Sequence, residues 1–362
     1  MESLSTGIAL LFTVKGGAFL ILGFAVGYLL RSLPRLGAAS ALALLIPFSF
    51  ALTAFDALVM AGGALGAVVF GEGITGIAAA ILSLPVLAAV SLFASWAAPA
   101  FGPPELFLLA VLTVVACAAW RGAHGLRALF AGILGLLFSI VGNPGSGQGI
   151  MPGGIGLLPA LVGLLLLAPL LALSVEGNSA RPTPEKSFRL PRLAGGGDAA
   201  SLIPLLALGI PAGAAGAVLV AYLVLHGAPG PLPAVGDSVA VSVLLPALAV
   251  GGIVAGLIGL SGFRPETLLW RMDIHVAVPS LTALSLAGVQ VSGGRVGDMI
   301  VAVGFGILGY FMIGRHYSRA VMAVGLVLGV QAAGSFNSSM ESAGGGWQIF
   351  FRPGLSLALL AL

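Results

Sequence analysis

Long apolar runs separated by short polar stretches dominate the pattern along the chain. Five of these runs cover residues 8–30, 106–120, 128–141, 155–175 and 239–260. A helix needs about 20 mostly apolar residues to cross the roughly 30 Å hydrocarbon core of a bilayer, so the longer runs fit one crossing each. The whole pattern predicts an all-α polytopic membrane protein with about 10–12 transmembrane helices.

The composition supports this prediction and excludes a soluble protein. Hydrophobic residues make up 59% of the 362 residues, charged residues 7%, and the mean hydropathy is +1.14. No soluble core could bury that much apolar surface, so the lipid bilayer is the expected surrounding. The run over residues 8–30 is too long and glycine-rich for a signal peptide, so we expect a retained helix whose Lys15 reaches toward the interface.

The basic residues predict an orientation, because cytoplasmic loops of membrane proteins are enriched in Lys and Arg. An outside N-terminus and a cytoplasmic C-terminus place nearly all loop arginines inside. The inside groups are Arg31 with Arg35, Arg121 with Arg127, the basic residues from 181 to 192, Arg264 with Arg271, and Arg315 with Arg319. Arg295 is the exception. The net charge of +3 is therefore interpreted as a topology signal and not as a nucleic-acid-binding surface.

One long polar stretch divides the chain. Residues 176–198 read "EGNSARPTPEKSFRLPRLAGGGD", and their Pro, Gly and charge content predicts a cytoplasmic linker. It separates an N-terminal membrane half, residues 1–175, from a C-terminal half, residues 199–362. The charged residues could bind a partner, but the favoured interpretation is a solvated loop that sets the topology.

Three stretches break the apolar pattern with Gly and Pro: "SLPRLGAAS" at 32–40, "FGEGITG" at 70–76 and "IPLLALGIPAGAAG" at 203–216. Irregular backbone at membrane depth persists only where it packs in protein or lines a wet cavity. In transporters, such a broken helix points its positive N-terminus at an anionic substrate. We therefore predict broken or re-entrant helices in two repeat-like halves, with the breaks near Pro34 and Pro211 facing each other at mid-membrane.

The glycines also have a second interpretation, as sites of close helix packing. The pairs Gly23/Gly27, Gly62/Gly66 and Gly252/Gly256 have the four-residue spacing of close helix-packing faces, which needs no transport site.

The breaks supply the candidate site residues. The substrate-binding candidates are Pro34, Arg35, Gly37, Gly71, Gly73, Thr75, Gly209, Pro211 and Gly213. Arg35 is a candidate counter-ion for a carboxylate because a guanidinium offers two parallel N–H donors, although a positive residue at a cytoplasmic helix end needs no such role. Glu72 is the ion-coupling candidate, as part of a cation or proton relay; if the helix ends there, it is interfacial instead.

Several stretches, in order along the chain, resemble the TctA family, the large membrane subunit of tripartite tricarboxylate transporters. "LIPLLALGIPAGAAGAVLVAYLVLHGAPGP" is similar to a family stretch of the form IPLLTLGIPG followed by HGxxPGP. "LPRLG" with "FGEGIT" resembles the family's LPGLG and YGGSIT, "FGPPELFLLAVL" its Pro-Pro-Glu helix start, and "FRPGLSL" its closing segment. The resemblance implies a bacterial inner membrane location, a small membrane subunit and a periplasmic solute-binding protein as partners, and carboxylates as substrates.

The chain also departs from the family pattern. An Asp-Gly-Tyr-Pro segment expected after "ILSLP" is absent, and "AGGGDAAS" stands where the second half has a PGAGA turn and an asparagine pair. Arg35 replaces a glycine, Glu72 and Gly73 replace Gly-Ser, and Ala212 replaces the last glycine of GIPG. Several binding segments of the family are therefore shortened or missing.

Other chemistry finds little support in the sequence. The four histidines, His124, His226, His275 and His316, have no metal-site spacing and are interpreted as interfacial. No catalytic constellation or phosphate-binding loop is present, so we expect neither an enzyme nor a bound cofactor. The expected function is a secondary-transporter subunit that imports small, tricarboxylate-like anions with Na⁺ or H⁺. The alternative is a transport-incompetent membrane scaffold that keeps the fold.

Overall fold

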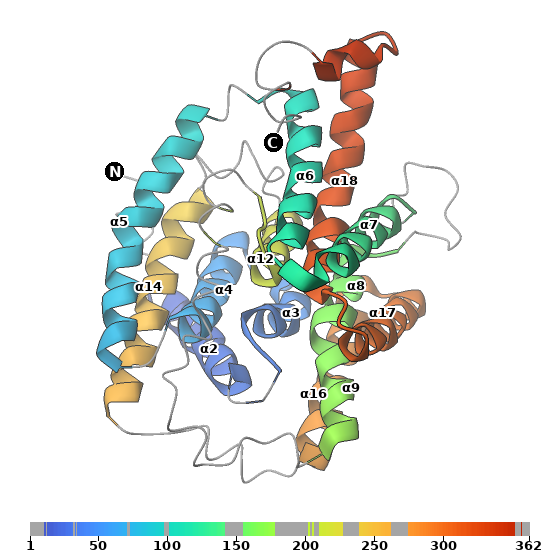
Figure 1. Cartoon of the computed structure of the whole chain (residues 1–362). Helices are drawn as coiled ribbons and strands as arrows, with labels where there is room; N and C mark the ends of the chain where they lie inside the picture. Colours follow the sequence, from blue (N-terminus) through green and yellow to red (C-terminus); the bar gives the residue numbers. More distant parts are fainter. Residues whose placement is uncertain are drawn as a thin grey trace.

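The computed structural model describes residues 11, 13–31, 33, 35–70, 73–97, 101–141, 155–177, 202, 205, 210–226, 239–261, 274–351 and 356. All regular structure within these residues is helical (Figure 1), which confirms the predicted all-α fold. In chain order the helices are α2 (Val14–Arg31), α3 (Ala38–Ser49), α4 (Ala54–Val69), α5 (Gly73–Ala97), α6 (Pro103–Ala119), η2 (Gly122–His124), α7 (Gly125–Val141), α8 (Leu157–Val162), the π-helical turn η4 (Gly163–Leu167), α9 (Ala168–Glu176), α12 (Ala214–Leu225), α14 (Val239–Leu260), α16 (Ile274–Gly293), α17 (Val296–Gly314), α18 (Arg319–Ser342) and η7 (Trp347–Phe351).

The helices have the lengths and composition of a multi-pass membrane protein. Seven helical stretches in the described part are long and apolar enough to cross a membrane: α2, η2 with α7, α8–η4–α9, α14, α16, α17 and α18. Helices α3, α4, α5, α6 and α12 add shorter apolar stretches of 10–17 residues. The predicted total of about 10–12 crossings therefore includes some of these shorter helices.

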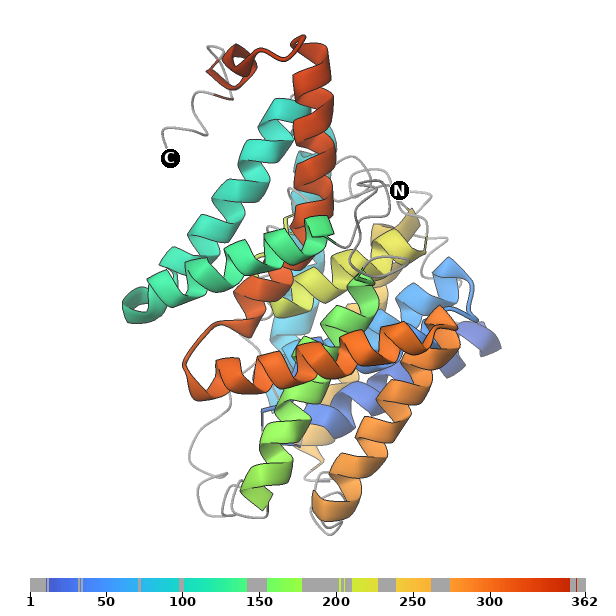
Figure 2. The same cartoon turned by 90° about the vertical axis from the view of Figure 1, so that its right-hand side faces the viewer.

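Two of the short helices, α3 and α12, lie at the centre of the molecule. Each has 12 residues and so is about 18 Å long, which is little more than half of a bilayer core of roughly 30 Å. In Figure 1 they lie between α2, α4, α5 and α14 on one side and α6 to α9 with α16 to α18 on the other. Figure 2 shows α17 crossing the middle of the α8–η4–α9 helix, where the π-helical turn lies.

Glycines let α4 approach its two neighbours closely. A Cβ at Gly63 would lie 2.6 Å from the Leu20 carbonyl oxygen of α2, and a Cβ at Gly62 would lie 2.6 Å from Ala247 Cβ of α14. Adjacent glycines of α4 thus face opposite helices. Gly23 and Gly27 of α2 likewise meet the backbone of α4. The helix-packing interpretation of these glycines is confirmed, because without side chains the backbones come into direct contact.

Helices from the two sequence halves pack against each other. Helix α14, from the second half, packs against α4 and α5 of the first, and α18 packs against α6 and α7. Of the linker, Glu176 and Gly177 are described, whereas residues 178–198 lie outside the described residues.

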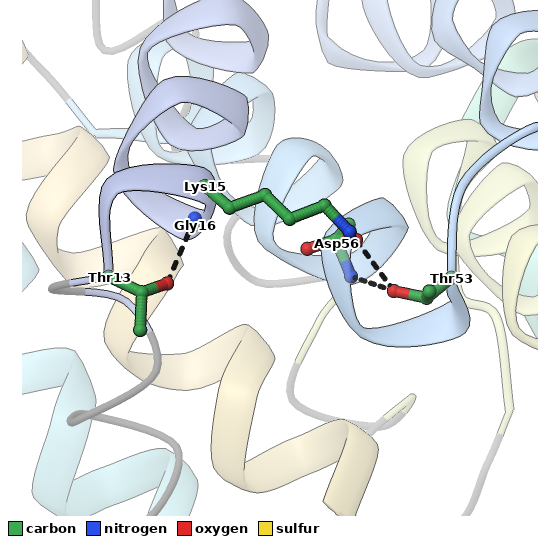
Figure 3. Close-up of polar contacts among 5 residues, drawn as sticks. All are labelled: Thr13, Lys15, Gly16, Thr53 and Asp56. Carbon is green, nitrogen blue, oxygen red and sulfur yellow. Dashed lines mark hydrogen bonds and ion pairs between the residues drawn. The ribbon is translucent and has the colours of Figure 1, made fainter.

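An ion pair between the exposed Lys15 and the buried Asp56 joins the starts of α2 and α4 (Figure 3). Lys15 Nζ lies 2.7 Å from Asp56 Oδ2, with the lysine side chain 66% exposed and the aspartate side chain 7% exposed. The Thr53 hydroxyl donates to the same Asp56 oxygen at 2.7 Å and accepts from the Asp56 amide at 3.3 Å, which caps α4. Lys15 thus has a carboxylate partner on a neighbouring helix, which its position in an apolar run did not reveal.

Replacing Lys15 with Met is expected to lower the free energy of unfolding by about 1–2 kcal/mol, because Asp56 would stay buried without a cation. Asp56→Asn keeps an oxygen for Thr53 and removes the charge, so the double variant should recover most of that loss. Thermal unfolding in detergent of both single variants and the double variant would measure the coupling. Strictly additive losses would show that the pair contributes no coupling energy.

Candidate anion-binding cavity

Both central helices begin at glycine caps that leave their first amides uncovered. The N-cap residues are Gly37 for α3 and Gly213 for α12, both in extended conformation and neither offering a side chain to accept from the helix. The first N–H groups of a helix have no partner within it, and an uncapped start is therefore suited to an anion. Cys117 holds the stretch before α12, because its Sγ lies 3.5 Å from the Ala212 carbonyl oxygen.

These two helix starts open into one cavity of about 560 Å³. It is lined by Arg35, Gly37, Ala38, Ala39 and Ser40 at the start of α3, by Ala214 at the start of α12, by Arg121, His124 and Ala128 around the α6–α7 connection, by Leu165 of η4, and by Ile313, His316, Tyr317, Ser318, Arg319 and Ala320 around the α17–α18 connection. Helix α18 also begins here, at the N-cap Ser318, whose hydroxyl accepts from Val321 N at 3.3 Å. The positive ends of three helices therefore meet at the cavity.

The side chains of the cavity add positive charge. Arg35, Arg121 and Arg319 line it, and its described lining includes no carboxylate. Arg35 forms an ion pair with Glu176, at the end of α9, which does not belong to that lining. Arg319 is half-buried, donates to the Leu164 carbonyl at 3.4 Å, and is close enough to Arg35 for the two charges to repel each other. A bound anion would relieve this repulsion.

Backbone strain is concentrated at the same cavity. Arg35 and His316 are the two non-glycine residues of the described chain with positive φ, at 68° and 59°. An L-residue in this left-handed region costs roughly 1–2 kcal/mol, and such residues cluster at binding sites. The rings of His124 and His316 stack at 5.4 Å with a 6° interplanar angle, which ties together the two loops that carry Arg121 and Arg319.

The structure brings together only some of the predicted site residues. Arg35 and Gly37 line the cavity, and Pro211 and Gly213 lie in the short stretch that leads to Ala214. Gly73 and Thr75, in contrast, start α5 beside α14 and are not part of the cavity lining; a Cβ at Gly256 would lie 3.0 Å from the Gly73 carbonyl oxygen.

Four further predicted residues, Pro34, Gly71, Glu72 and Gly209, lie outside the described residues. A binding role for Gly73 and Thr75 and an ion-coupling role for Glu72 stay predictions. Within the described part of the chain, no group of three or more His, Cys, Asp or Glu side chains could hold a metal ion.

Sequence reasoning missed the cavity residues that lie in the α6–α7 and α17–α18 connections. From the sequence alone, Arg121 and Arg319 are interpreted only as topology signals, and His124 and His316 only as interfacial residues. A signal was present: in both connections an arginine and a histidine are three residues apart, Arg121 with His124 and His316 with Arg319. Only the packing of α6, α7 and α18 places these pairs around one cavity.

Comparison with known proteins identifies the family. The model described as "Tripartite tricarboxylate transporter TctA family" matches residues 73–193 and 196–324. The matched segments begin after "LPRLG" and end before "FRPGLSL", so these two resemblances lie outside the match. Searches of curated proteins and of solved structures found no match. Because the match covers most of the chain, this protein belongs to the TctA family, the membrane components of tripartite tricarboxylate transporters.

Proposed function

We propose that the chain is a secondary-transporter subunit that imports small, tricarboxylate-like anions in symport with Na⁺ or H⁺. In this proposal it works in the bacterial inner membrane with a small membrane subunit and receives substrate from a periplasmic solute-binding protein. The observation that carries the proposal is the cavity. The uncapped starts of α3 and α12 and three arginines line it, and its described lining contains no carboxylate.

The cavity suits a small polyanion in charge and in size. Its volume of about 560 Å³ lies within the range of pockets for small molecules, roughly 300–1,000 Å³. Arg35 and Arg319 can each donate paired N–H groups to a carboxylate, while the free amides of Ala38, Ala39 and Ala214 offer further donors. A substrate with two or three carboxylates could therefore bridge the arginines and the helix starts.

The predicted topology agrees with an importer in its releasing conformation. Arg35, Arg121 and Arg319 all belong to groups that the arginine pattern assigns to the cytoplasmic side. Under that assignment the cavity lies toward the cytoplasm, where imported substrate leaves. The scaffold alternative rests on the missing family segments, but it does not account for a cavity of this charge.

Uptake by proteoliposomes that hold the complete tripartite complex tests the proposal. We expect accumulation of at least one labelled di- or tricarboxylate, and we expect this accumulation to require both an ion gradient and the binding protein. Liposomes without the small membrane subunit and a monocarboxylate of similar size serve as controls. Absence of uptake and of binding across the panel at low ionic strength would favour the scaffold.

A further inference from the structure

The far ends of α3 and α12 meet at His226. This residue is the C-cap of α12, and its Nδ1 lies 2.8 Å from the Tyr222 carbonyl oxygen in the last turn of that helix. Its Nε2 lies 3.2 Å from the carbonyl oxygen of Ser49, the last residue of α3. One imidazole thus bridges the C-terminal ends of the two helices whose N-terminal ends open into the cavity.

The number of hydrogen bonds in this bridge depends on which ring nitrogens carry a proton. A carbonyl oxygen only accepts hydrogen bonds, and a neutral imidazole carries an N–H on one of its two nitrogens. With a neutral ring, one of the two contacts would set a nitrogen lone pair against an oxygen lone pair. Both contacts can be hydrogen bonds at the same time only when both ring nitrogens carry a proton, so that the ring is positively charged.

The surroundings favour that charge. The C-terminal end of a helix carries partial negative charge, and His226 lies at two such ends. The Tyr222 ring lies beside the imidazole, with the ring centroids 4.8 Å apart and the planes tilted by 31°, and an aromatic face attracts a cation. Tyr222 is fully buried and fixed by its hydroxyl, which donates to the Ala57 carbonyl of α4 at 2.8 Å.

The charged groups of the neighbouring helices α4 and α18 have other partners or lie at the other end of α12. From α3 and α12 the ring meets Ser49 and Tyr222. On α4, Asp56 is already paired with Lys15 of α2. Arg319 of α18, which also packs on α12, lies beside the cavity at the other end of α12.

We propose that His226 is the binding site of the coupling ion and that this ion is a proton; the inference rests on the proposed transport function. An anion holds the positive N-terminal ends of α3 and α12 together at the cavity, and the proton on His226 holds their negative C-terminal ends together. When the ring returns its proton to water, one carbonyl contact becomes repulsive and the two helix ends separate. Substrate and proton therefore stabilise the same arrangement of one helix pair.

The protonation state can be measured without transport. The purified full chain, labelled with ¹⁵N-histidine, contains four histidines, and the signal absent from His226→Gln identifies this ring. At the pH used for carboxylate binding we expect both of its nitrogens to be protonated. A spectrum with one protonated and one bare nitrogen would overturn the proposal. If His226→Gln does not fold, His226→Lys, which offers N–H donors and a permanent charge, provides the same assignment.

Transport by the reconstituted complex tests the coupling. A pH gradient, acidic outside, should drive carboxylate accumulation by the parent, and His226→Gln should lower it by about tenfold or more. Because coupling between two bound ligands is reciprocal, the carboxylate affinity of the parent should rise as the pH falls, and that of His226→Gln should not. His275→Gln, the same change at an exposed residue of α16 outside the cavity lining, should transport like the parent. Accumulation driven by a sodium gradient alone, equal in parent and variant, would overturn the proton site and leave the transport function intact. A parent chain that binds no carboxylate would instead refute the transport function, and the ¹⁵N spectrum would still decide the state of His226.

Discussion

Arg35→Gly is expected to weaken carboxylate binding by about 10- to 100-fold while it leaves the fold intact. Hydrogen bonds to charged groups contribute roughly 1.5–3 kcal/mol each, and a tenfold change in affinity corresponds to about 1.4 kcal/mol. Glycine relieves the strain of a φ of 68°, but its greater freedom in the unfolded chain and the lost contact to Glu176 oppose this gain. The free energy of unfolding should therefore stay within about 1 kcal/mol of the parent.

Arg319→Gln is a second variant that tests whether the cavity binds carboxylates. It keeps polar donors at the start of α18 but removes the charge that repels Arg35, so the ligand-free protein should be no less stable and carboxylate affinity should again fall by about 10-fold or more. Arg295→Gln, at an exposed residue outside the cavity lining, changes the net charge equally and is the matched control. Calorimetric titration in nanodiscs would measure the affinities. Equal losses in all three variants would show a general effect of net charge and not a site.

Gly66→Ala is expected to destabilise the protein by about 3 kcal/mol, because the added methyl group has no space between α4 and α14. Its Cβ would lie 2.8 Å from the Gly252 backbone nitrogen, 2.9 Å from Gly251 Cα and closer still to the Leu248 carbonyl oxygen. All three obstacles are backbone atoms, so no side-chain rotation can make room. The helices must separate, which loses contact along the whole interface. Thermal unfolding and size-exclusion chromatography in detergent would measure the loss.

Gly304→Ala on α17 is the matched control for this prediction. Apart from the adjacent backbone of its own helix, no described heavy atom lies within 4 Å of a Cβ built at Gly304, so the change creates no clash and should raise stability through helix propensity by up to about 1 kcal/mol. A Gly66→Ala variant as stable as Gly304→Ala would contradict the described packing of α4 on α14.

The sequence by itself determined the environment, the fold class and the family. Runs of apolar residues and the scarcity of charge require a bilayer, and a bilayer admits these runs only as helices. The glycines and prolines around Gly37 and Gly213 also located the starts of α3 and α12, because backbone breaks are a local property of the chain. The order of the motifs was sufficient to identify the TctA family.

Only the tertiary structure decided which of these local features meet. The breaks before α3 and α12 share a cavity, whereas Gly73, in a stretch of similar composition, starts a helix against α14. Arg319 lines the same cavity as Arg35, although nearly the whole chain separates them, and His226 reaches Ser49 across 177 residues. Local composition fixes where a helix begins and which medium surrounds it, but the approach of two helix ends depends on the close packing of many distant side chains. That packing leaves no periodic signal in the sequence.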